Sequence, residues 1–313
     1  MPRRASHAEP PPERFRESAF PSLFLLSSEG IKRKVFLPFP PWHSAVKQQE
    51  EELDLQLNSK TALIFGAGGG LGGAIARSLA AEGVSVVVAD IHEESATATA
   101  EAISGAGGKA IPLVWDIGDL SLIGQKLDAI KAAFGPVDIL VNNTGGPPPT
   151  PAAGQSPDDW SKYFDLMVRS VIAVTDAVLP GMRERQWGRI ITSTSSGVVA
   201  PIANLGISNS LRLALVGWSK TLAREVGRDG ITANIVLPGR IATGRIVFLD
   251  EQKAKRENRP VADVTAESTG SIPVGRYGDP KEYGDTVSFL ASPRASYITG
   301  SVIRVDGGLI NSI

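Results

Sequence analysis

A glycine-rich turn between an apolar strand and a helix is the feature that most constrains how this chain folds. The apolar run 61–65 is followed by Gly66, Gly70 and Gly72, then by a helical pattern and a second apolar strand at 84–90. Strand, turn, helix and strand form a βαβ unit, in which glycines let a phosphate approach the backbone at the start of the helix. The sequence therefore predicts an α/β fold with a phosphate site at this turn.

The same alternation of strands and helices continues along the chain. Further strands are predicted at 111–115 and 137–141, with helices at 93–103 and 120–134. Near-continuous apolar strands linked by helices are typical of a parallel sheet that helices cover on both faces. We therefore expect one doubly wound α/β domain over residues 53–313, a span that a single large domain can fill.

The first 52 residues do not follow this pattern. They lack sustained periodicity and begin with a segment rich in proline and charge, which is typical of disorder. The run 48–52, Gln-Gln-Glu-Glu-Glu, would be encoded by purine-rich codons that resemble a bacterial ribosome-binding site just before Leu53. We therefore interpret residues 1–52 as a disordered segment or as a mis-called extension of the chain.

Charge and composition exclude several classes of function. A net charge of −1 gives no reason to expect nucleic acid or an anionic membrane surface as a partner. The chain has no cysteine, which excludes disulfides, thiolate catalysis and thiolate-bound metal. Its histidines, His7, His43 and His92, are too scattered to predict a metal site. We expect a cytoplasmic protein that acts on a small molecule and holds no metal.

Three further segments carry a resemblance to a known family. The stretch 188–239 resembles the catalytic core of the short-chain dehydrogenase/reductases, and the spacing of Gly66, Gly70 and Gly72 matches their glycine fingerprint. Asn142-Asn143-Thr144-Gly145 resembles the family's Asn-Asn-Ala-Gly motif, and 237–243 resembles its Pro-Gly segment. The resemblance covers about residues 55–310. It implies a Rossmann fold and a homo-oligomer, a tetramer or dimer, built on the helices around 160–180 and 208–225.

The resemblance also implies which residues contact a nicotinamide dinucleotide. Asp116 and the backbone N–H of Ile117 would contact the adenine, and Thr243 with the backbone of Ile241 would hold the nicotinamide carboxamide. The full set comes from the turn, the strand ends and the Pro-Gly segment: Gly66, Gly70, Leu71, Gly72, Asp90, Asp116, Ile117, Asn143, Thr144, Gly145, Arg212, Pro238, Gly239, Ile241 and Thr243.

Asp90 at the end of the second strand bears on the choice between NAD and NADP. A carboxylate there accepts both ribose hydroxyls and repels a 2′-phosphate. Gly69 occupies a position that is often basic in relatives that prefer NADP. Both observations favour NAD and make NADP the less favoured cofactor. The alternative is that Asp90 only caps the segment that follows it, because Asp is a common cap.

The catalytic positions depart from the family's Ser-Tyr-Lys-Asn set. Ser195 falls at the family's serine, with Thr194 or Ser196 as alternatives if the register is shifted by one residue. Ser208 falls at the tyrosine and Arg212, four residues later, at the lysine. An alkyl hydroxyl titrates far above the value of about 10 typical of tyrosine, and arginine stays protonated.

A fourth position is changed as well, since Met167 falls at the family's asparagine. The chain thus resembles a divergent subgroup, similar to 3-oxoacyl-acyl carrier protein reductases, that lacks the full set. We expect an NAD(P)-dependent oxidoreductase that interconverts a secondary alcohol and a ketone. Ser195 and Ser208 would hold the oxygen and Arg212 would stabilise the oxyanion. The alternatives are a cofactor-binding pseudoenzyme or sensor, and a non-redox lyase or epimerase.

Residues 244–272 are predicted to form a lid over the substrate, because the family varies most there and a lid excludes water. The basic residues of this segment are Lys253, Lys255, Arg256 and Arg259. Because Glu251 and Glu257 are interleaved with them, we interpret them as a solvated helix face. The alternative is that they attract an anionic substrate or carrier.

Overall fold

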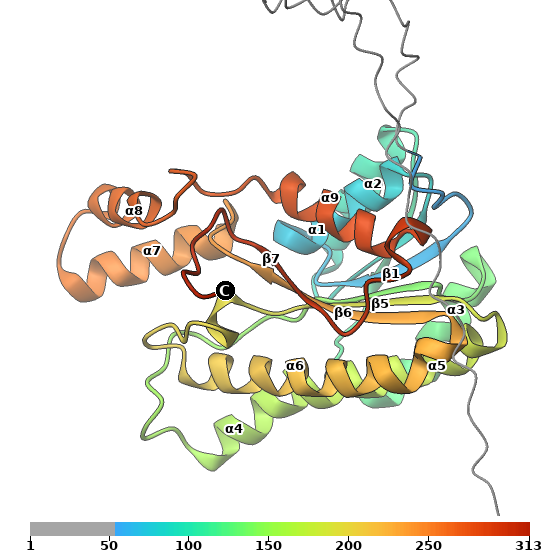
Figure 1. Ribbon diagram of the computed structural model, residues 1–313, viewed down its shortest axis with the longest axis horizontal. Coiled ribbons are helices and arrows are strands. Elements are labelled where there is room, and N and C mark those ends of the chain that lie inside the picture. The colour runs from blue at the N-terminus through green and yellow to red at the C-terminus, as the bar shows by residue number, and fades with distance from the viewer. Residues whose placement is uncertain (1–53) are drawn as a thin grey trace, which may run out of the picture. The chain divides into compact units, whose positions relative to one another are not determined.

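Seven parallel strands form one sheet in the computed structural model, which describes residues 54–313 (Figure 1). The strand order is β3-β2-β1-β4-β5-β6-β7, and every pair of neighbours is parallel. This confirms the predicted doubly wound Rossmann fold. The predictions for residues 1–52 lie outside the described residues. The strands are β1 Thr61–Phe65, β2 Ser85–Asp90, β3 Lys109–Val114, β4 Ile139–Asn142, β5 Gly188–Ser193, β6 Ile231–Pro238 and β7 Val302–Val305.

Helices cover both faces of the sheet, with α1, α2 and α9 on one side and α3, α5 and α6 on the other (Figure 1). Short 3₁₀ turns lie at Leu120–Leu122, Ser196–Val198, Gly227–Asp229 and Pro293–Ala295, and a π-helical segment at Asp165–Arg169 joins α4 to α5. The α-helices are α1 Gly70–Ala81, α2 Glu93–Gly105, α3 Ile123–Phe134, α4 Pro157–Phe164, α5 Ser170–Glu184, α6 Gly206–Val226, α7 Gly244–Glu257, α8 Val261–Gly270 and α9 Pro280–Ala291.

Alternate side chains of the central strands enter two separate cores. Ile64 and its neighbours on one face pack with Ile75 and Leu79 of α1. Leu63 and Leu140 point to the other face, among side chains of α3, α5 and α6. Each fully buried side chain of this size contributes about 1.5–3 kcal/mol. Burial on both faces explains why the strands read as continuous apolar runs.

The sheet reverses its strand order between β1 and β4, since β2 and β3 lie on one side of β1 and β4 to β7 on the other. Loops leaving neighbouring strands on either side of such a point diverge and open a crevice at the carboxyl ends, where open α/β folds bind ligands. The glycine turn after β1 and the segment after β4 meet at this crevice. The topology therefore brings the predicted cofactor and catalytic segments to one edge of the sheet.

The element bounds differ in places from the predicted ones. β3 begins at Lys109, two residues before the predicted start, because its pairing with β2 starts at Ser85. The predicted helix 120–134 begins with a 3₁₀ turn in which the N–H of Ser121 donates to the side chain of Asp119. Among residues 54–313, no helix is long and apolar enough to cross a membrane.

Candidate functional site

Only glycine fits at the tightest point of the turn after β1. Gly66 and Gly70 have φ values of 59° and 53°, in the left-handed region that favours glycine. A Cβ added to Gly72 would lie 2.1 Å from the carbonyl oxygen of Gly66. In the part of the chain that the structure describes, no side chain caps α1, and its first turn carries no acidic residue. The backbone N–H groups at this end of α1 are thus suited to an anion.

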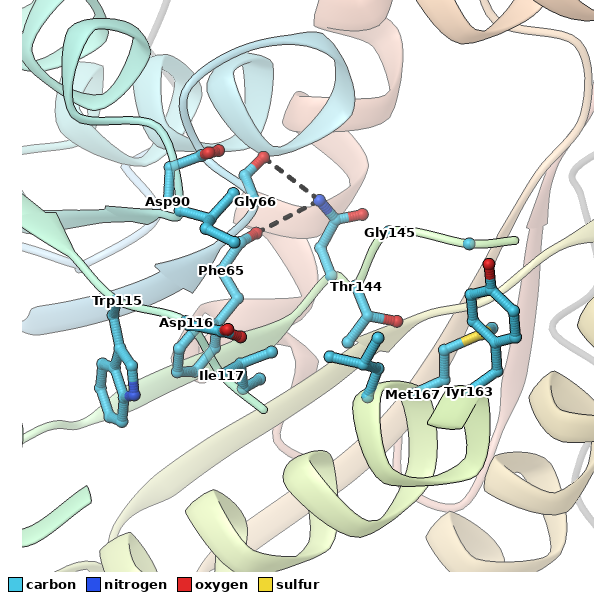
Figure 2. Close-up of a pocket in the computed structure, with 14 residues that line it drawn as sticks. Phe65, Gly66, Asp90, Trp115, Asp116, Ile117, Thr144, Gly145, Tyr163 and Met167 are labelled. Carbon is cyan, nitrogen blue, oxygen red and sulfur yellow. Dashed lines mark hydrogen bonds between the residues drawn. The ribbon is translucent and has the colours of Figure 1, made fainter. Parts of the chain in front are cut away.

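Asn143 holds this turn from the neighbouring strand. Its Nδ2 donates to the carbonyl oxygens of Phe65 at 3.2 Å and of Gly66 at 3.4 Å (Figure 2). Because Asn143 directly follows β4, this bridge ties the two sides of the crevice together. The side chain predicted to contact the cofactor therefore also shapes the turn that would bind it.

Asp90 contacts the turn from the end of β2. Its Oδ2 accepts from Gly68 N at 2.9 Å and its Oδ1 accepts from His92 N at 3.0 Å. The second bond is local, to a residue two positions later, and the helix α2 that follows has no side-chain cap among the described residues. Each carboxylate oxygen has a further lone pair for a ribose hydroxyl. This local bond and ribose binding are therefore compatible at this residue.

A cavity of about 320 Å³ beside Asp90 brings the predicted adenine contacts together (Figure 2). Asp116 and Ile117 line it, and Asp116 Oδ1 accepts from Gly118 N at 2.9 Å. Trp115 lies edge-on to Phe65 with ring centroids 4.9 Å apart. The rings of Phe65 and Trp115 give this cavity an apolar surface, and Asp90 and Asp116 add carboxylates. Such a combination suits the base and sugar of a nucleoside.

A second cavity of about 1100 Å³ holds most of the other predicted residues. Gly72 lies buried beneath the glycine turn, while Asp90, Asp116 and Ile117 belong to the smaller cavity. The predicted residues that line the large cavity are Gly66, Gly70, Leu71, Asn143, Thr144, Gly145, Ser195, Ser208, Arg212, Pro238, Gly239, Ile241 and Thr243. One continuous space thus joins the predicted cofactor and catalytic groups.

Ser195 caps the 3₁₀ turn after β5, where its Oγ accepts from Gly197 N at 3.1 Å. Thr194 and Ser196, the alternatives, also line the cavity but are buried, whereas Ser195 is partly exposed. Accessibility therefore favours Ser195 among the three.

Ser208 and Arg212 lie one helical turn apart on α6, and both face Gly146. A Cβ added to Gly146 would lie 3.4 Å from Arg212 Nη2 and 3.9 Å from Ser208 Oγ. Residues four apart on a helix share a face, so the sequence spacing predicts this arrangement. Within residues 54–313, the Ser208 hydroxyl has no protein hydrogen-bond partner, which leaves it available to a ligand in the cavity.

Arg212 is buried and is held by backbone carbonyls. Nη1 donates to Ser193 O at 3.3 Å, and Nη2 donates to Thr144 O and Gly145 O, each at 3.1 Å. Burial lowers the pKa of Arg212 to about 10; Tyr283 opposes this shift, and the positive charge of Arg245 adds to it. At neutral pH the guanidinium is therefore a fixed cation at the wall of the cavity.

Met167 lies in the π-helical segment between α4 and α5 and is buried among Val171, Ile207 and Leu211. It lines the smaller cavity beside Tyr163 (Figure 2). Its thioether is only a weak hydrogen-bond acceptor. The packing therefore explains a methionine here without a role in proton transfer.

Two residues near Arg212 were not found by sequence reasoning. Tyr283 of α9 is fully buried, its Oη lies 2.8 Å from Ser193 Oγ, and burial raises its pKa. Arg245, the second residue of α7, donates from Nη2 to Pro147 O at 3.0 Å. No local sequence signal points to either, because both contacts join segments far apart in the chain.

Comparison with known proteins places these features in one family. A family model described as enoyl-(acyl carrier protein) reductase matches residues 66–310. The 3-oxoacyl-acyl carrier protein reductase FabG of Escherichia coli is 37% identical over 257 residues, which cover 82% of this chain and 99% of that protein.

Two solved structures are similar in fold and sequence. An actinorhodin polyketide ketoreductase variant with NADPH has a TM-score of 0.78 and 32% identity, over 81% of this chain and 98% of that one. The L-sorbose reductase of Gluconobacter frateurii, complexed with NADPH and L-sorbose, has a TM-score of 0.79 and 29% identity, over 83% of this chain and 100% of that one.

Proposed function

The chain belongs to the short-chain dehydrogenase/reductase family, and from this premise we propose that it interconverts a ketone and a secondary alcohol with a nicotinamide cofactor. The observation that carries the proposal is the large cavity, which joins the glycine turn to Ser195, Ser208 and Arg212. The substrate is a small molecule with a carbonyl or hydroxyl group. The protein works as a homo-oligomer, a tetramer or dimer, and its cytoplasmic location stays a prediction.

The chain's own residues fit a dinucleotide. The uncapped start of α1 and the turn around Gly66 suit its diphosphate, because Gly72 leaves no room for a side chain. Asp116 and Ile117 border the adenine, while Arg212, Ile241 and Thr243 border the nicotinamide half. When bound, the nicotinamide supplies or accepts the hydride.

Asp90 supports NAD over NADP in this proposal. Its carboxylate lies beside the glycine turn, where a 2′-phosphate would meet a like charge. The two solved relatives contain NADPH and give this preference no support. The choice therefore rests on Asp90, and binding measurements with both cofactors decide it.

In the direction of reduction, the carbonyl carbon gains the hydride and its oxygen takes up the electron pair of the double bond. Ser208 and Ser195 donate hydrogen bonds to this oxygen. Arg212 stabilises its developing negative charge, as a fixed cation in a partly enclosed cavity does most effectively. The proton comes from water or from the substrate, since Met167 and Arg212 do not readily release one.

A second candidate is a cofactor-binding protein without turnover. The observation that favours it is the attachment of Arg212 to three backbone carbonyls, which gives the guanidinium a structural role. A lyase or epimerase has no comparable observation in its favour.

Cofactor titration followed by a substrate panel separates these functions. Protein fluorescence is recorded while NADH or NADPH is added, and a panel of ketones is then followed at the absorbance of the reduced nicotinamide. We expect cofactor binding and ketone reduction, with kcat lowered at least about tenfold by Ser208→Ala and cofactor affinity retained. Binding of the cofactor without oxidation by any ketone would instead support the second candidate.

Restoring the family's pair is a further test. The double variant Ser208→Tyr with Arg212→Lys regains a phenol and an ammonium at the family's positions. We expect it to reduce the same ketones as the wild type, at a changed rate. A reductase activity that appears only in the double variant contradicts the redox assignment of the wild type.

A further inference from the structure

Arg245 lines the large cavity from the start of α7. Its side chain is exposed, and its Nη2 donates to Pro147 O at 3.0 Å. The guanidinium also lies 5.5 Å from the ring of Phe248 on the same helix. Arg245 therefore joins the predicted lid to the segment that follows β4, next to the proposed catalytic residues.

Arg245 and Arg212 contact the same short loop. Arg212 binds Gly145 O, and Arg245 binds Pro147 O two residues later. Two residues of chain span at most about 7 Å. Ser208 faces Gly146, which lies between these two carbonyls in the chain. The guanidiniums of Arg212 and Arg245 and the hydroxyl of Ser208, which is proposed to bind the substrate oxygen, thus lie in one part of the cavity.

Arg212 and Arg245 differ in charge balance from the three other basic residues that line the large cavity. Arg240 pairs with Asp250 at 3.2 Å, Lys253 pairs with Glu267 at 2.7 Å, and Arg256 lies 3.9 Å from Glu257. Within the described chain, neither Arg212 nor Arg245 has a carboxylate within ion-pair distance. Removal from water without an anion is unfavourable for the buried Arg212, and the guanidinium of either arginine can bind a carboxylate with two parallel hydrogen bonds.

A third arginine shows what a purely structural role looks like. Arg189 is buried and bonded to carbonyl oxygens, including that of Gly188 at 2.8 Å, and it stacks on the Trp187 ring at 4.6 Å. It lines neither of the two cavities described above. Arg212 and Arg245 differ from it because their guanidiniums border open space that a ligand can enter.

The direction of Arg245 favours the substrate over the cofactor as its anion. Thr243, two residues earlier, faces the glycine turn, with its side chain 3.9 Å from a Cβ added to Gly70. Arg245 reaches instead to Pro147, beyond the cofactor segment that ends at Gly145. The cavity also has charged side chains of α7, such as Lys253 and Glu257, and its apolar lining includes Pro149, Ala200, Ile202, Leu205, Ile246 and Leu249.

We propose that the substrate is a ketone, or the corresponding alcohol, that carries a carboxylate and an otherwise apolar body. Arg245 binds the carboxylate, and Arg212 and Ser208 face the reacting oxygen. This inference rests on the proposed function for the identity of the reacting group, while the carboxylate site itself can be tested by binding alone.

Calorimetric titration of the protein saturated with NADP⁺ or NAD⁺ tests the site without turnover, because the oxidised cofactor has no hydride to give to a ketone. The probes are 4-phenyl-2-oxobutanoate and its methyl ester, which differ in the charge at one end. We expect the acid to bind the wild type at least tenfold more tightly than the ester. Arg245→Gln reduces this preference to less than threefold. The control Arg183→Gln, which removes the same charge from an exposed residue of α5 that lines neither cavity, keeps it.

Equal binding of acid and ester, no binding of either, or a preference that survives Arg245→Gln would overturn the inference. So would a loss of cofactor affinity in Arg245→Gln with the preference unchanged, because the anion would then be the cofactor's diphosphate. If the acid binds as expected but no ketone is reduced, the carboxylate site stands and the oxidoreductase proposal fails. A matching thermal midpoint for all variants confirms that they are folded.

Discussion

Ser208 and Arg212 keep the positions of the family's phenol and ammonium on α6 but differ from them in acidity. Burial lowers the pKa of Arg212 to about 10, and its guanidinium stays charged at neutral pH. The hydroxyl of Ser208 ionises far above the range of a phenol. Neither group therefore changes its charge between pH 6 and 9. A tyrosine whose pKa is lowered by the family's lysine would lose its proton in this range.

This difference predicts the pH profile of the proposed reduction. Arg212 has a lowered pKa, so its charge is complete below that value and is lost as pH rises through about 10. We expect kcat/KM to be level from pH 6 to 9 and to fall above about pH 10. Steady-state kinetics with circular dichroism at each pH checks this. The double variant Ser208→Tyr with Arg212→Lys serves as the comparison and should gain a step below pH 9. A step below pH 8 in the wild type would rule out this account.

Substitution of Asp90 tests whether its carboxylate makes the protein prefer NADH to NADPH. Asp90→Asn keeps an acceptor for Gly68 N but removes the charge that opposes a 2′-phosphate. We expect the ratio of NADPH to NADH affinity to rise at least about tenfold, or roughly 1.4 kcal/mol. Fluorescence titration with both cofactors measures it. Asp229→Asn, in the 3₁₀ turn that precedes β6 and outside both cavities, should leave the ratio unchanged. An unchanged ratio in Asp90→Asn would show that this carboxylate does not select the cofactor.

The helices α1 and α9 pack closely on one face of the sheet, and the reason lies in Gly284. A Cβ added there would lie 2.5 Å from Ser78 Oγ and 2.8 Å from the carbonyl oxygen of Ala74. The backbone of α1 cannot move away easily, because Ile75 and Leu79 hold it in the core. A small residue on α9 thus sets how near the two helices lie.

Gly284→Ala should therefore destabilise the protein by about 1–3 kcal/mol through overpacking. For a domain of this size, the thermal midpoint falls about 2–4 °C for each kcal/mol, which calorimetry resolves. The matched control is Gly124→Ala in α3, where no atom of the described residues lies within 4 Å of the added Cβ, and stability should be unchanged or raised by up to about 1 kcal/mol. Equal midpoints for Gly284→Ala and the wild type would refute the packing argument.

The presence and type of the elements could be predicted from the sequence, while some of their ends could not. The runs 61–65 and 84–90 become β1 and β2 almost residue for residue, because fully buried strands need continuous apolar side chains. The start of β3 depends on its pairing with β2, and the start of α3 on a local 3₁₀ turn. The first end is set by pairing with another strand and the second by a local hydrogen bond from Ser121 N to Asp119, and hydrophobic periodicity contains neither.

At the scale of the whole molecule, the strand order places the predicted site at one edge of the sheet. The resemblance also predicts assembly through the helices around 160–180 and 208–225. Two large apolar side chains in or beside these segments, Phe164 and Leu213, are 43% and 52% exposed in the single chain. This is the kind of surface that a subunit interface covers.

Leu213→Glu should therefore reduce the mass of the assembly, because a charge in an apolar interface is unfavourable. Size-exclusion chromatography with light scattering gives the mass, and we expect a tetramer or dimer for the wild type and smaller species for the variant. Val274→Glu changes an equally exposed residue outside these helices and should leave the mass unchanged. A monomeric wild type, or a Leu213→Glu variant of wild-type mass, would contradict the predicted interface.

The sequence by itself determined the fold class and the position of the phosphate turn, because apolar periodicity and glycine spacing are local properties. It also placed Ser208 and Arg212 on one helix face, since four residues make about one turn. Only the tertiary structure decided that Arg212 has no carboxylate partner among residues 54–313, that Arg245 reaches the same loop and that Tyr283 contacts Ser193. These relations depend on how distant segments pack, and the charge balance of a buried group is a property of that packing.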